Sequence, residues 1–290
     1  MEFLVLTKTE QITVHPAEDG DRQYLANLIH FGAYVHRHLD WRPPLDWIGQ
    51  SPFLVARRND EIVGALACPP DPPNVAWVRL FAVAHGVSTE NIWEELWPKA
   101  SLQLSDLVGL LKVAAIPLHG WFHTLLESSQ FDSSHKVVVL SWKRQERAPA
   151  QLNTFTNLRP MLLDDISAIE LIDAAAFGGV WQNSQSCLEI AFRQSAIATV
   201  IEVNGKLIGY QISTTTQLGG HLARLAVLPD HQGTGIGYAL LDDMLSQFER
   251  RGVRSVTVNT QHDNHISLSL YQKARFRLTG EEYPVYECNA

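Results

Sequence analysis

The chain has no excess of positive charge, and this limits the partners that we expect for it. Lys and Arg together number 23, whereas Asp and Glu number 31, so the formal net charge at pH 7 is −8. Residues 1–145 and 146–290 share this negative balance, and neither half contains a basic block. Binding to a phosphate backbone requires clustered basic side chains, so we expect no nucleic-acid partner.

Cysteines and long hydrophobic runs are also scarce. The cysteines lie far apart, at Cys68, Cys187 and Cys288, which matches neither a disulfide framework nor a zinc motif. We therefore expect no metal site and a reducing, cytoplasmic location. The strongest apolar run, residues 108–116, is short and contains Lys112, so we expect no membrane span. The first residues lack the basic start and long apolar stretch of a signal peptide.

What is present is a globular composition with an internal repeat. Hydrophobic residues make up 46% and charged residues 19% of the 290 positions, which indicates two domains or one large domain. At an offset of 145, Asn59 to Gly64 (NDEIVG) aligns with Asn204 to Gly209 (NGKLIG), and Arg79-Leu80 aligns with Arg224-Leu225. The repeat therefore favours two copies of one α/β unit.

We place the two copies at residues 1–145 and 156–290, joined near Gln145 to Thr156. In the second copy, periodicity predicts a helix pair, a meander and then alternating helices and strands, which together give a mixed sheet flanked by helices. The predicted elements are a strand at 158–161, helices at 164–177 and 186–194, a hairpin of 198–203 and 206–214 turning at Asn204-Gly205, a strand at 221–228, a helix at 237–250, a strand at 253–260, a helix at 266–273 and an extended tail from Phe276.

The loop Gln232 to Gly237 (QGTGIG) lies between a predicted strand and a predicted helix and carries the strongest functional signal. Its three glycines have no Cβ to obstruct a ligand, and the N–H groups at a helix start favour a pyrophosphate. The loop is not a Walker loop, because Ile236 follows Gly235 where a Lys is needed. Neither glycine frame ends in Gly or Ala, so the dinucleotide fingerprint also fails. The pattern Gln/Arg-x-x-Gly-x-Gly/Ala is met in full.

A second segment, Asn264 to Phe276 (NHISLSLYQKARF), follows the pattern Asn-x-x-Ala-x-x-Leu-Tyr-x-x-x-Gly-Phe. Ser267 takes the small-residue place, and Arg275 replaces the usual glycine, which makes the local turn less certain. Over residues 156–290 the two motifs together resemble the GNAT superfamily of N-acetyltransferases. With the repeat, this resemblance implies an α/β fold of two GNAT-like domains in tandem, each a mixed, mostly antiparallel sheet flanked by helices.

The resemblance also implies acetyl-CoA as the cofactor and direct transfer of the acetyl group to an amine. The acceptor would be a small-molecule amine or a peptide N-terminus, and the chain a monomer or homodimer. An amide near Ala226 or Val227 would polarise the thioester carbonyl, and Tyr271 would protonate the leaving thiolate. The residues that the resemblance assigns to cofactor binding are Leu225, Ala226, Val227, Gln232, Gly233, Thr234, Gly235, Ile236, Gly237, Tyr238, Asn259 and Asn264.

The general base is harder to assign. Bacterial enzymes that acetylate ribosomal-protein N termini look similar in this half, but they carry a Glu where this chain has Asn259. His221 is the best alternative, because the ordinary histidine pKa is near neutrality. Glu202 and Asp263 are second choices. Because the Glu is missing, a non-catalytic acyl-CoA-binding sensor remains an alternative function.

The first copy lacks these groups. When 145 is subtracted, Glu90 stands at the place of Gly235 and Leu126 at the place of Tyr271, while Ser88 begins an ordinary capped helix. We therefore expect a degenerate first copy that binds no CoA and whose role is to cover the catalytic copy.

Overall fold

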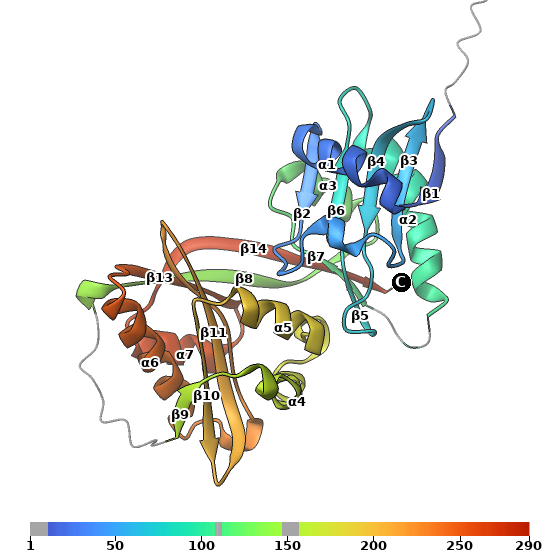
Figure 1. The fold of residues 1–290 in the computed structure, drawn as a ribbon. Helices are drawn as coiled ribbons and strands as arrows, with labels where there is room; N and C mark the ends of the chain where they lie inside the picture. Colours follow the sequence, from blue (N-terminus) through green and yellow to red (C-terminus); the bar gives the residue numbers. More distant parts are fainter. Residues whose placement is uncertain (1–10, 108, 110–111, 147–156, 290) are drawn as a thin grey trace, which may run out of the picture. The chain divides into compact units, whose positions relative to one another are not determined.

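The computed structural model describes residues 11–107, 109, 112–146 and 157–289 of the chain. Two compact units make up the chain (Figure 1). Unit 1 consists of Met1–Asp132 and Tyr286–Ala290, and unit 2 consists of Ser133–Val285.

These units do not follow the boundary expected from the sequence, because two long strands exchange. Strand β8 (Asp132–Lys143), which the repeat assigns to the first copy, pairs through residues 137–143 with β13 (Ser255–Gln261) of unit 2. Strand β14 (Arg277–Asn289) lies beside β8 and ends in unit 1, where its last residues pair with β7 (Lys112–Ala115). The two units thus divide after residue 132 and not at 145, and residues 147–156 of the expected linker Gln145 to Thr156 lie outside the described residues.

Unit 1 contains a five-stranded antiparallel sheet in the order β1-β3-β4-β6-β2. A further strand, β5, pairs in parallel with β7. Phe81, Trp93 and Phe122 belong to its main core cluster, which α2 and α3 help to form. The remaining elements of unit 1 are β1 (Thr13–Pro16), α1 (Arg22–Phe31), β2 (Tyr34–Arg37), β3 (Phe53–Arg58), β4 (Glu61–Ala67), β5 (Val75–Trp77), β6 (Leu80–Val83), α2 (Thr89–Ser105) and α3 (Gly120–Glu127).

Unit 2 contains the strand order β14-β8-β13-β12-β11-β10-β9, in which only the β12–β13 contact among the described pairings is parallel. Helices α4 and α5 lie against one face of this sheet, and α6 and α7 lie on the other (Figure 1). The remaining elements are β9 (Leu158–Pro160), α4 (Ile166–Ala176), the 3-10 helix η5 (Gly179–Trp181), α5 (Gln185–Gln194), β10 (Ile197–Val203), β11 (Lys206–Thr216), β12 (Gly219–Val227), α6 (Ile236–Arg250) and α7 (His265–Lys273).

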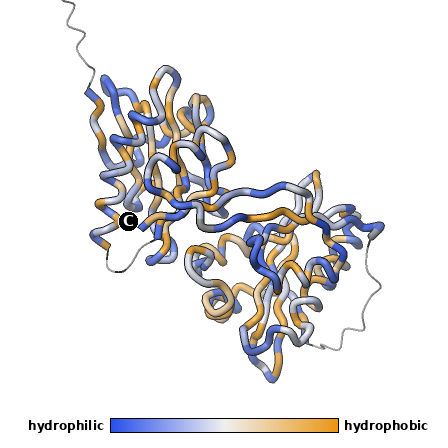
Figure 2. Tube along the Cα trace, turned by 180° about the vertical axis from the view of Figure 1, so that it is seen from behind, coloured by the Kyte–Doolittle hydropathy of each residue, from blue (hydrophilic) through white to orange (hydrophobic). Residues whose placement is uncertain are grey.

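The predicted α/β class and the order of elements in the second copy are confirmed, and local chemistry explains why they form. Asn204 and Gly205 both adopt positive φ, 52° and 75°, as the tight hairpin between β10 and β11 requires. Helix α6 buries Leu240, Met244 and Phe248 completely on its sheet-facing side. Figure 2 shows hydrophobic stretches running along the strands of unit 2.

The sequence repeat corresponds to a structural repeat. Before α1, the Asp21 carboxylate accepts the N–H of Glu18, and before α4 the Asp165 carboxylate accepts the N–H of Leu162. A short 3-10 turn ends at each of these aspartates, Asp19–Asp21 and Leu163–Asp165. At this point the two units therefore correspond at an offset of 144 residues.

Candidate active site

The centre of the site is the place where β12 and β13 diverge. The two strands pair in parallel only where Gly220–Leu222 lies opposite Val256–Val258. Just beyond, the register of β12 against β11 shifts so that Ala223 has no partner, which is a β-bulge. Within the described residues, β13 then continues beside β8 while β12 continues beside β11 to Val227. Residues 223–227 therefore have no strand on the β13 side among the residues that the structure describes.

The backbone groups on this open edge can be assigned from the strand alternation. The N–H of Leu228 donates to the carbonyl of Ile208 on the β11 side, at 2.8 Å. Successive residues of a strand point their backbone groups to alternate edges, so Ala226 also faces β11. Leu225 and Val227 consequently face the open edge. Of the two amides expected to polarise a carbonyl, the N–H of Val227 is the one that a ligand along this edge can meet.

The open edge leads directly into the glycine loop. Gly233 and Gly235 adopt φ of 73° and 93°, conformations that strain other residues. Gly235 is the N-cap of α6 and provides no side chain to cap it, so the first-turn N–H groups have no acceptor from a capping side chain. Two hydrogen bonds brace the exposed loop, from Gln232 Nε2 to the carbonyl of Val227 at 3.0 Å and from Thr234 Oγ1 to the carbonyl of His231 at 2.7 Å.

Helix α7 packs beside the first turn of α6. A Cβ built on Gly237 would lie 3.4 Å from Leu270, an ordinary contact, so the packing of the protein itself does not require glycine at this position. Lys273 on α7 places its ammonium 4.8 Å from the centre of the Tyr238 ring. A cation therefore lies near the positive end of the α6 dipole, an arrangement that suits an anionic ligand.

Tyr271 is buried on α7, with 5% of its surface exposed. Its ring lies 5.7 Å from that of Phe276 and belongs to the core cluster beneath α6. Burial raises the pKa of the Tyr271 hydroxyl above its ordinary value of 10, because the phenolate would be poorly solvated. The hydroxyl is therefore protonated at neutral pH. Arg275, in the position of the usual glycine, adopts a φ of 68°, so the turn after α7 keeps the left-handed conformation.

The two asparagines expected at the site differ in their surroundings. Asn264 is the N-cap of α7: its Oδ1 accepts the N–H of Ser267 at 3.1 Å, and its Nδ2 donates to Gln261 at 3.3 Å. Asn259 is exposed on β13 opposite Val139, in the part of the strand that has diverged from β12.

The three candidate general bases also differ in their contacts and exposure. His221 lies where β12 and β13 still pair, with Nδ1 2.9 Å from Thr257 Oγ1, and burial lowers its pKa below 6.5, so it is neutral at pH 7. The Glu202 carboxylate on β10 is held by Arg159 at 2.6 Å. Asp263 is half exposed and lies 3.8 Å from His135.

A buried ionic network on the α4 side of β12 was missed from the sequence. Asp173 of α4 is completely buried and accepts hydrogen bonds from the Tyr210 hydroxyl and from two nitrogens of Arg224, both at 2.8 Å. The available signal was a carboxylate within the apolar stripe of a predicted helix, where charged residues are rare unless paired.

The same network holds the segment between α4 and α5. Arg224 Nη2 donates to the carbonyl of Trp181 at 2.6 Å, and its guanidinium carbon lies 3.6 Å from the centre of the Phe177 ring. Asp173 also accepts the N–H of Asn183 at 2.9 Å. Residues 177–183 are therefore anchored at several points to the strand that carries the open edge. We call this set of contacts the Asp173–Arg224 clamp.

In unit 1 the corresponding helix start is closed. Ser88 is the N-cap of α2, its hydroxyl accepts the N–H of Asn91 at 3.2 Å, and it also contacts Glu90 at 2.6 Å. The register expected from the sequence, with Glu90 at the place of Gly235, is therefore wrong. The connection from strand to helix is shorter in unit 1, so the N-cap Ser88 corresponds to the N-cap Gly235.

Two features that would indicate other functions are absent from the described residues. These residues contain no cluster of three or more His, Cys, Asp or Glu side chains arranged to hold a metal ion. No helix in the same residues has both the length and the apolar character needed to cross a membrane.

Comparison with known proteins identifies the class of unit 2. Residues 167–276 match the family model described as "Acetyltransferase (GNAT) family", so the chain contains a GNAT acetyltransferase domain. That match spans the open edge of β12, the glycine loop and Tyr271.

Curated relatives resemble this chain over a limited stretch. One is "[Ribosomal protein bS18]-alanine N-acetyltransferase" from Escherichia coli K12, 32% identical over 73 residues, which is 25% of this chain and 49% of the relative. Another is "N-alpha-acetyltransferase 30" from Schizosaccharomyces pombe, 31% identical over 61 residues, or 21% of this chain and 41% of that protein. The chain thus matches about half of the length of these relatives or less.

Solved structures resemble the chain over nearly its whole length. A tandem GNAT protein from the clavulanic acid biosynthesis pathway superimposes with a TM-score of 0.63 at 16% identity, covering 96% of this chain and 98% of that one. A GCN5-related N-acetyltransferase from Sphaerobacter thermophilus gives a TM-score of 0.60 at 17% identity, covering 96% and 95%. At these identities the likeness establishes the fold.

Proposed function

We propose that this protein is an acetyl-CoA-dependent N-acetyltransferase whose reaction takes place in unit 2. The observation that carries the proposal is the continuous path from the open edge of β12 to the uncapped start of α6. An extended amide-containing arm can pair with such an edge, and a pyrophosphate can bind such a helix start. The names of the curated relatives support transfer to an amine.

The residues along this path fit acetyl-CoA. Leu225 and Val227 would offer backbone groups to the pantetheine arm, and the N–H groups of residues 233–238 would hold the pyrophosphate. Lys273 adds a positive charge near the same helix turn. Acetyl-CoA, when bound, supplies the acetyl group as a thioester.

The chain's own groups would then act on the reacting atoms. The Val227 N–H donates a hydrogen bond to the carbonyl oxygen, on which negative charge develops. Tyr271 holds a proton at neutral pH and donates it to the departing thiolate. His221 is neutral and can accept a proton from the amine, although its lowered pKa makes it a weak base.

The acceptor that we propose is a small-molecule amine or a peptide N-terminus. The bacterial relative is named for acetylating an alanine of a ribosomal protein, and the yeast relative is named as an N-alpha-acetyltransferase. A cytoplasmic location and a monomeric or homodimeric state are further parts of the proposal.

We propose that unit 1 is a degenerate copy that binds no CoA. Its helix start is occupied by the Ser88 hydroxyl and the neighbouring Glu90 carboxylate, which would repel a pyrophosphate.

A second candidate function is a non-catalytic acyl-CoA sensor, which the Asn259 position and the weakly basic His221 favour. Turnover separates the two functions. Purified protein is incubated with acetyl-CoA and a panel of amines and N-terminal peptides, and free thiol is measured. Thiol release that depends on the amine supports the enzyme. Binding of acetyl-CoA without release for any acceptor supports the sensor, and absence of binding contradicts both.

A further inference from the structure

The two units differ in the segment that follows their first helix. In unit 1 the chain leaves α1 at Phe31 and forms strand β2, Tyr34–Arg37. In unit 2 the chain leaves α4 at Ala176 and forms the 3-10 helix η5. At the offset of 144 that relates the two helices, residues 34–37 correspond to residues 178–181. One segment of the repeat therefore has two conformations in the same chain.

The strand edge beside this segment also corresponds between the units. β4 pairs Gly64 with Val83, as β11 pairs Gly209 with Val227. β5 pairs in parallel with β7, as the start of β12 pairs with β13. The edge of β6, residues 80–83, thus corresponds to residues 224–227, which include the open edge in unit 2.

In unit 1 this edge is occupied by β2. The pairing is antiparallel, with Tyr34 opposite Val83 and Arg37 opposite Leu80. The next residue, His38, continues the contact by donating its N–H to the carbonyl of Arg79 at 3.0 Å. A segment of the chain therefore lies along the edge where, in unit 2, we propose that the pantetheine arm binds.

Side chains fix β2 in this position. His36 is 2% exposed, its Nε2 lies 3.0 Å from the carbonyl of Val78, and its ring stacks on Phe122 at 4.2 Å. Tyr34 contacts the ring of Trp121 at 5.3 Å. Phe122 and Trp121 belong to α3, which corresponds to the Tyr271 helix α7. β2 is therefore packed against the helix that faces the cofactor in the other copy.

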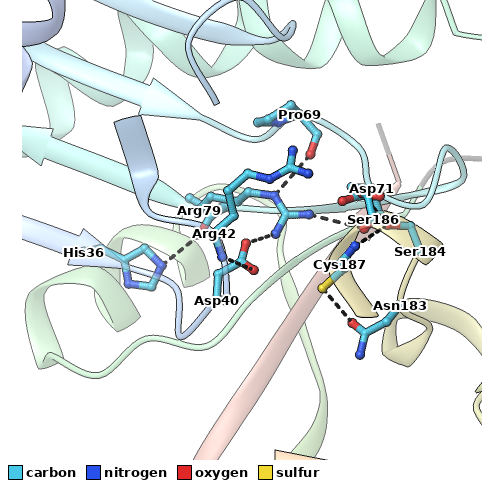
Figure 3. Close-up of polar contacts among 11 residues, drawn as sticks. His36, Asp40, Arg42, Pro69, Asp71, Arg79, Asn183, Ser184, Ser186 and Cys187 are labelled. Carbon is cyan, nitrogen blue, oxygen red and sulfur yellow. Dashed lines mark hydrogen bonds and ion pairs between the residues drawn. The ribbon is translucent and has the colours of Figure 1, made fainter. Parts of the chain in front are cut away.

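The carboxylate of the Asp173–Arg224 clamp has no counterpart in unit 1. At the offset of 144, Asp173 corresponds to Ile29. The arginine of unit 1, Arg79, instead pairs with Asp40 and donates to the carbonyls of Pro69 and Asp71 at 3.3 Å (Figure 3). Arg79 therefore does not hold the segment after α1 away from the strand edge.

The amino acids of this segment also differ between the two units, in agreement with the two conformations. Tyr34 and Val35 favour a strand, whereas their counterparts Gly178 and Gly179 do not. Gly179 adopts a φ of 57°, a left-handed conformation that a strand does not use and that valine strongly disfavours.

We propose that the Asp173–Arg224 clamp and the Gly178-Gly179 pair are positioning elements that keep the cofactor edge of unit 2 open, and that β2 closes the same edge in unit 1. The cofactor readout of this inference rests on the proposed function of unit 2, but its structural readout does not. Residues 34–37 would then occupy, in unit 1, the edge that corresponds to the proposed position of the pantetheine arm in unit 2.

The test transfers the unit 1 residues into unit 2 of the full-length chain as Gly178→Tyr with Gly179→Val. If the segment then closes the edge in about nine molecules of ten, the apparent Kd for acetyl-CoA rises about tenfold. Calorimetry measures this change, and hydrogen exchange should slow at the amides of Leu225 and Val227. The reciprocal pair, Tyr34→Gly with Val35→Gly, is the matched control: exchange should speed up at residues 80–83 while the acetyl-CoA affinity stays unchanged.

If the double variant does not fold, a single conservative substitution in the Asp173–Arg224 clamp provides a second test. Arg224→Lys retains a buried cation beside Asp173 but loses the planar fork that also holds the Trp181 carbonyl. We expect an affinity loss of about threefold and altered exchange at residues 177–183 and 225–227. Wild-type affinity and exchange in the folded variants would overturn the proposal. A wild-type chain that binds no acetyl-CoA would overturn the proposed function instead, and the exchange rates would still test the clamp.

Discussion

Unit 1 and unit 2 contain corresponding strands, but one strand edge is paired in unit 1 and open in unit 2. In unit 2, the edge of β12 is open, leads into a loop with two left-handed glycines and ends at an uncapped helix. In unit 1, the edge of β6 is paired with β2, and the following helix is capped by Ser88. The proposed cofactor site therefore differs between the units in two short connections rather than in the sheet itself.

The largest effect is expected from removing β8. A fragment of residues 156–290 follows the sequence repeat but lacks the strand that pairs with β13 and buries Leu140 and Trp142. Each large apolar side chain of this kind contributes about 1.5–3 kcal/mol. We expect this fragment to lack cooperative thermal unfolding by circular dichroism, whereas a fragment of residues 132–290 should regain it. Equal folding of the two fragments would contradict the strand exchange.

The next largest effect is expected at the glycine loop. Gly235→Glu places a side chain at a φ of 93° and a carboxylate at the helix start, so acetyl-CoA binding should be abolished in calorimetry. Gly252→Glu is the matched control, because Gly252 lies beyond the other end of α6 with a φ of 80° and open space around it. Unchanged affinity in the Gly235 variant would exclude this loop as the site.

A smaller effect, on rate alone, is expected at Tyr271. Tyr271→Phe removes the proton donor and should lower turnover about 10²–10⁴-fold, the usual range for general acid catalysis, with little change in acetyl-CoA affinity. Tyr24→Phe, at an exposed position of unit 1, should leave the rate unchanged. Near-normal turnover of the Tyr271 variant across the pH range would remove this residue from the mechanism.

The smallest effect concerns the stability of the closed copy. Burial, together with the nearby His38, lowers the pKa of His36 from 6.5 to about 3. Below pH 6.5 the unfolded chain therefore binds a proton that the folded chain does not, so stability falls as pH decreases towards 3, by at most about 1.4 kcal/mol per pH unit.

Burial also lowers the pKa of His38 to about 3, so His36→Gln should reduce this dependence by the share of one histidine, as measured by denaturant unfolding at a series of pH values. His30→Gln, at an exposed position of α1, serves as the control and should keep the wild-type slope. An identical slope for the His36 variant would show that His36 is not the group responsible.

The sequence predicts the elements of unit 2 well because each rests on a local pattern. The hairpin follows from Asn204-Gly205, and helix α6 follows from its apolar face; it begins one residue before the expected start and ends at the expected residue 250. The unit boundary is not predictable in this way, because the pairing of β8 with β13 joins residues far apart in the sequence.

The site is predictable in part. The glycine loop and the Tyr271 helix lie where the motifs indicate, because motif and local structure coincide. The strand β2 and the Asp173–Arg224 clamp were not predicted, since each depends on a tertiary partner that no local pattern names. The roles of Tyr271, His221 and the cofactor-binding residues remain predictions.

The assignment of cofactor binding to unit 2 alone is tested by titrating the full-length chain with acetyl-CoA in a calorimeter, with and without Gly235→Glu. We expect one site per chain, which the Gly235 variant loses, because among the described residues only unit 2 has an open strand edge that leads to a helix start without a capping side chain. Two sites per chain, or one site that survives the substitution, would contradict the assignment of the two units.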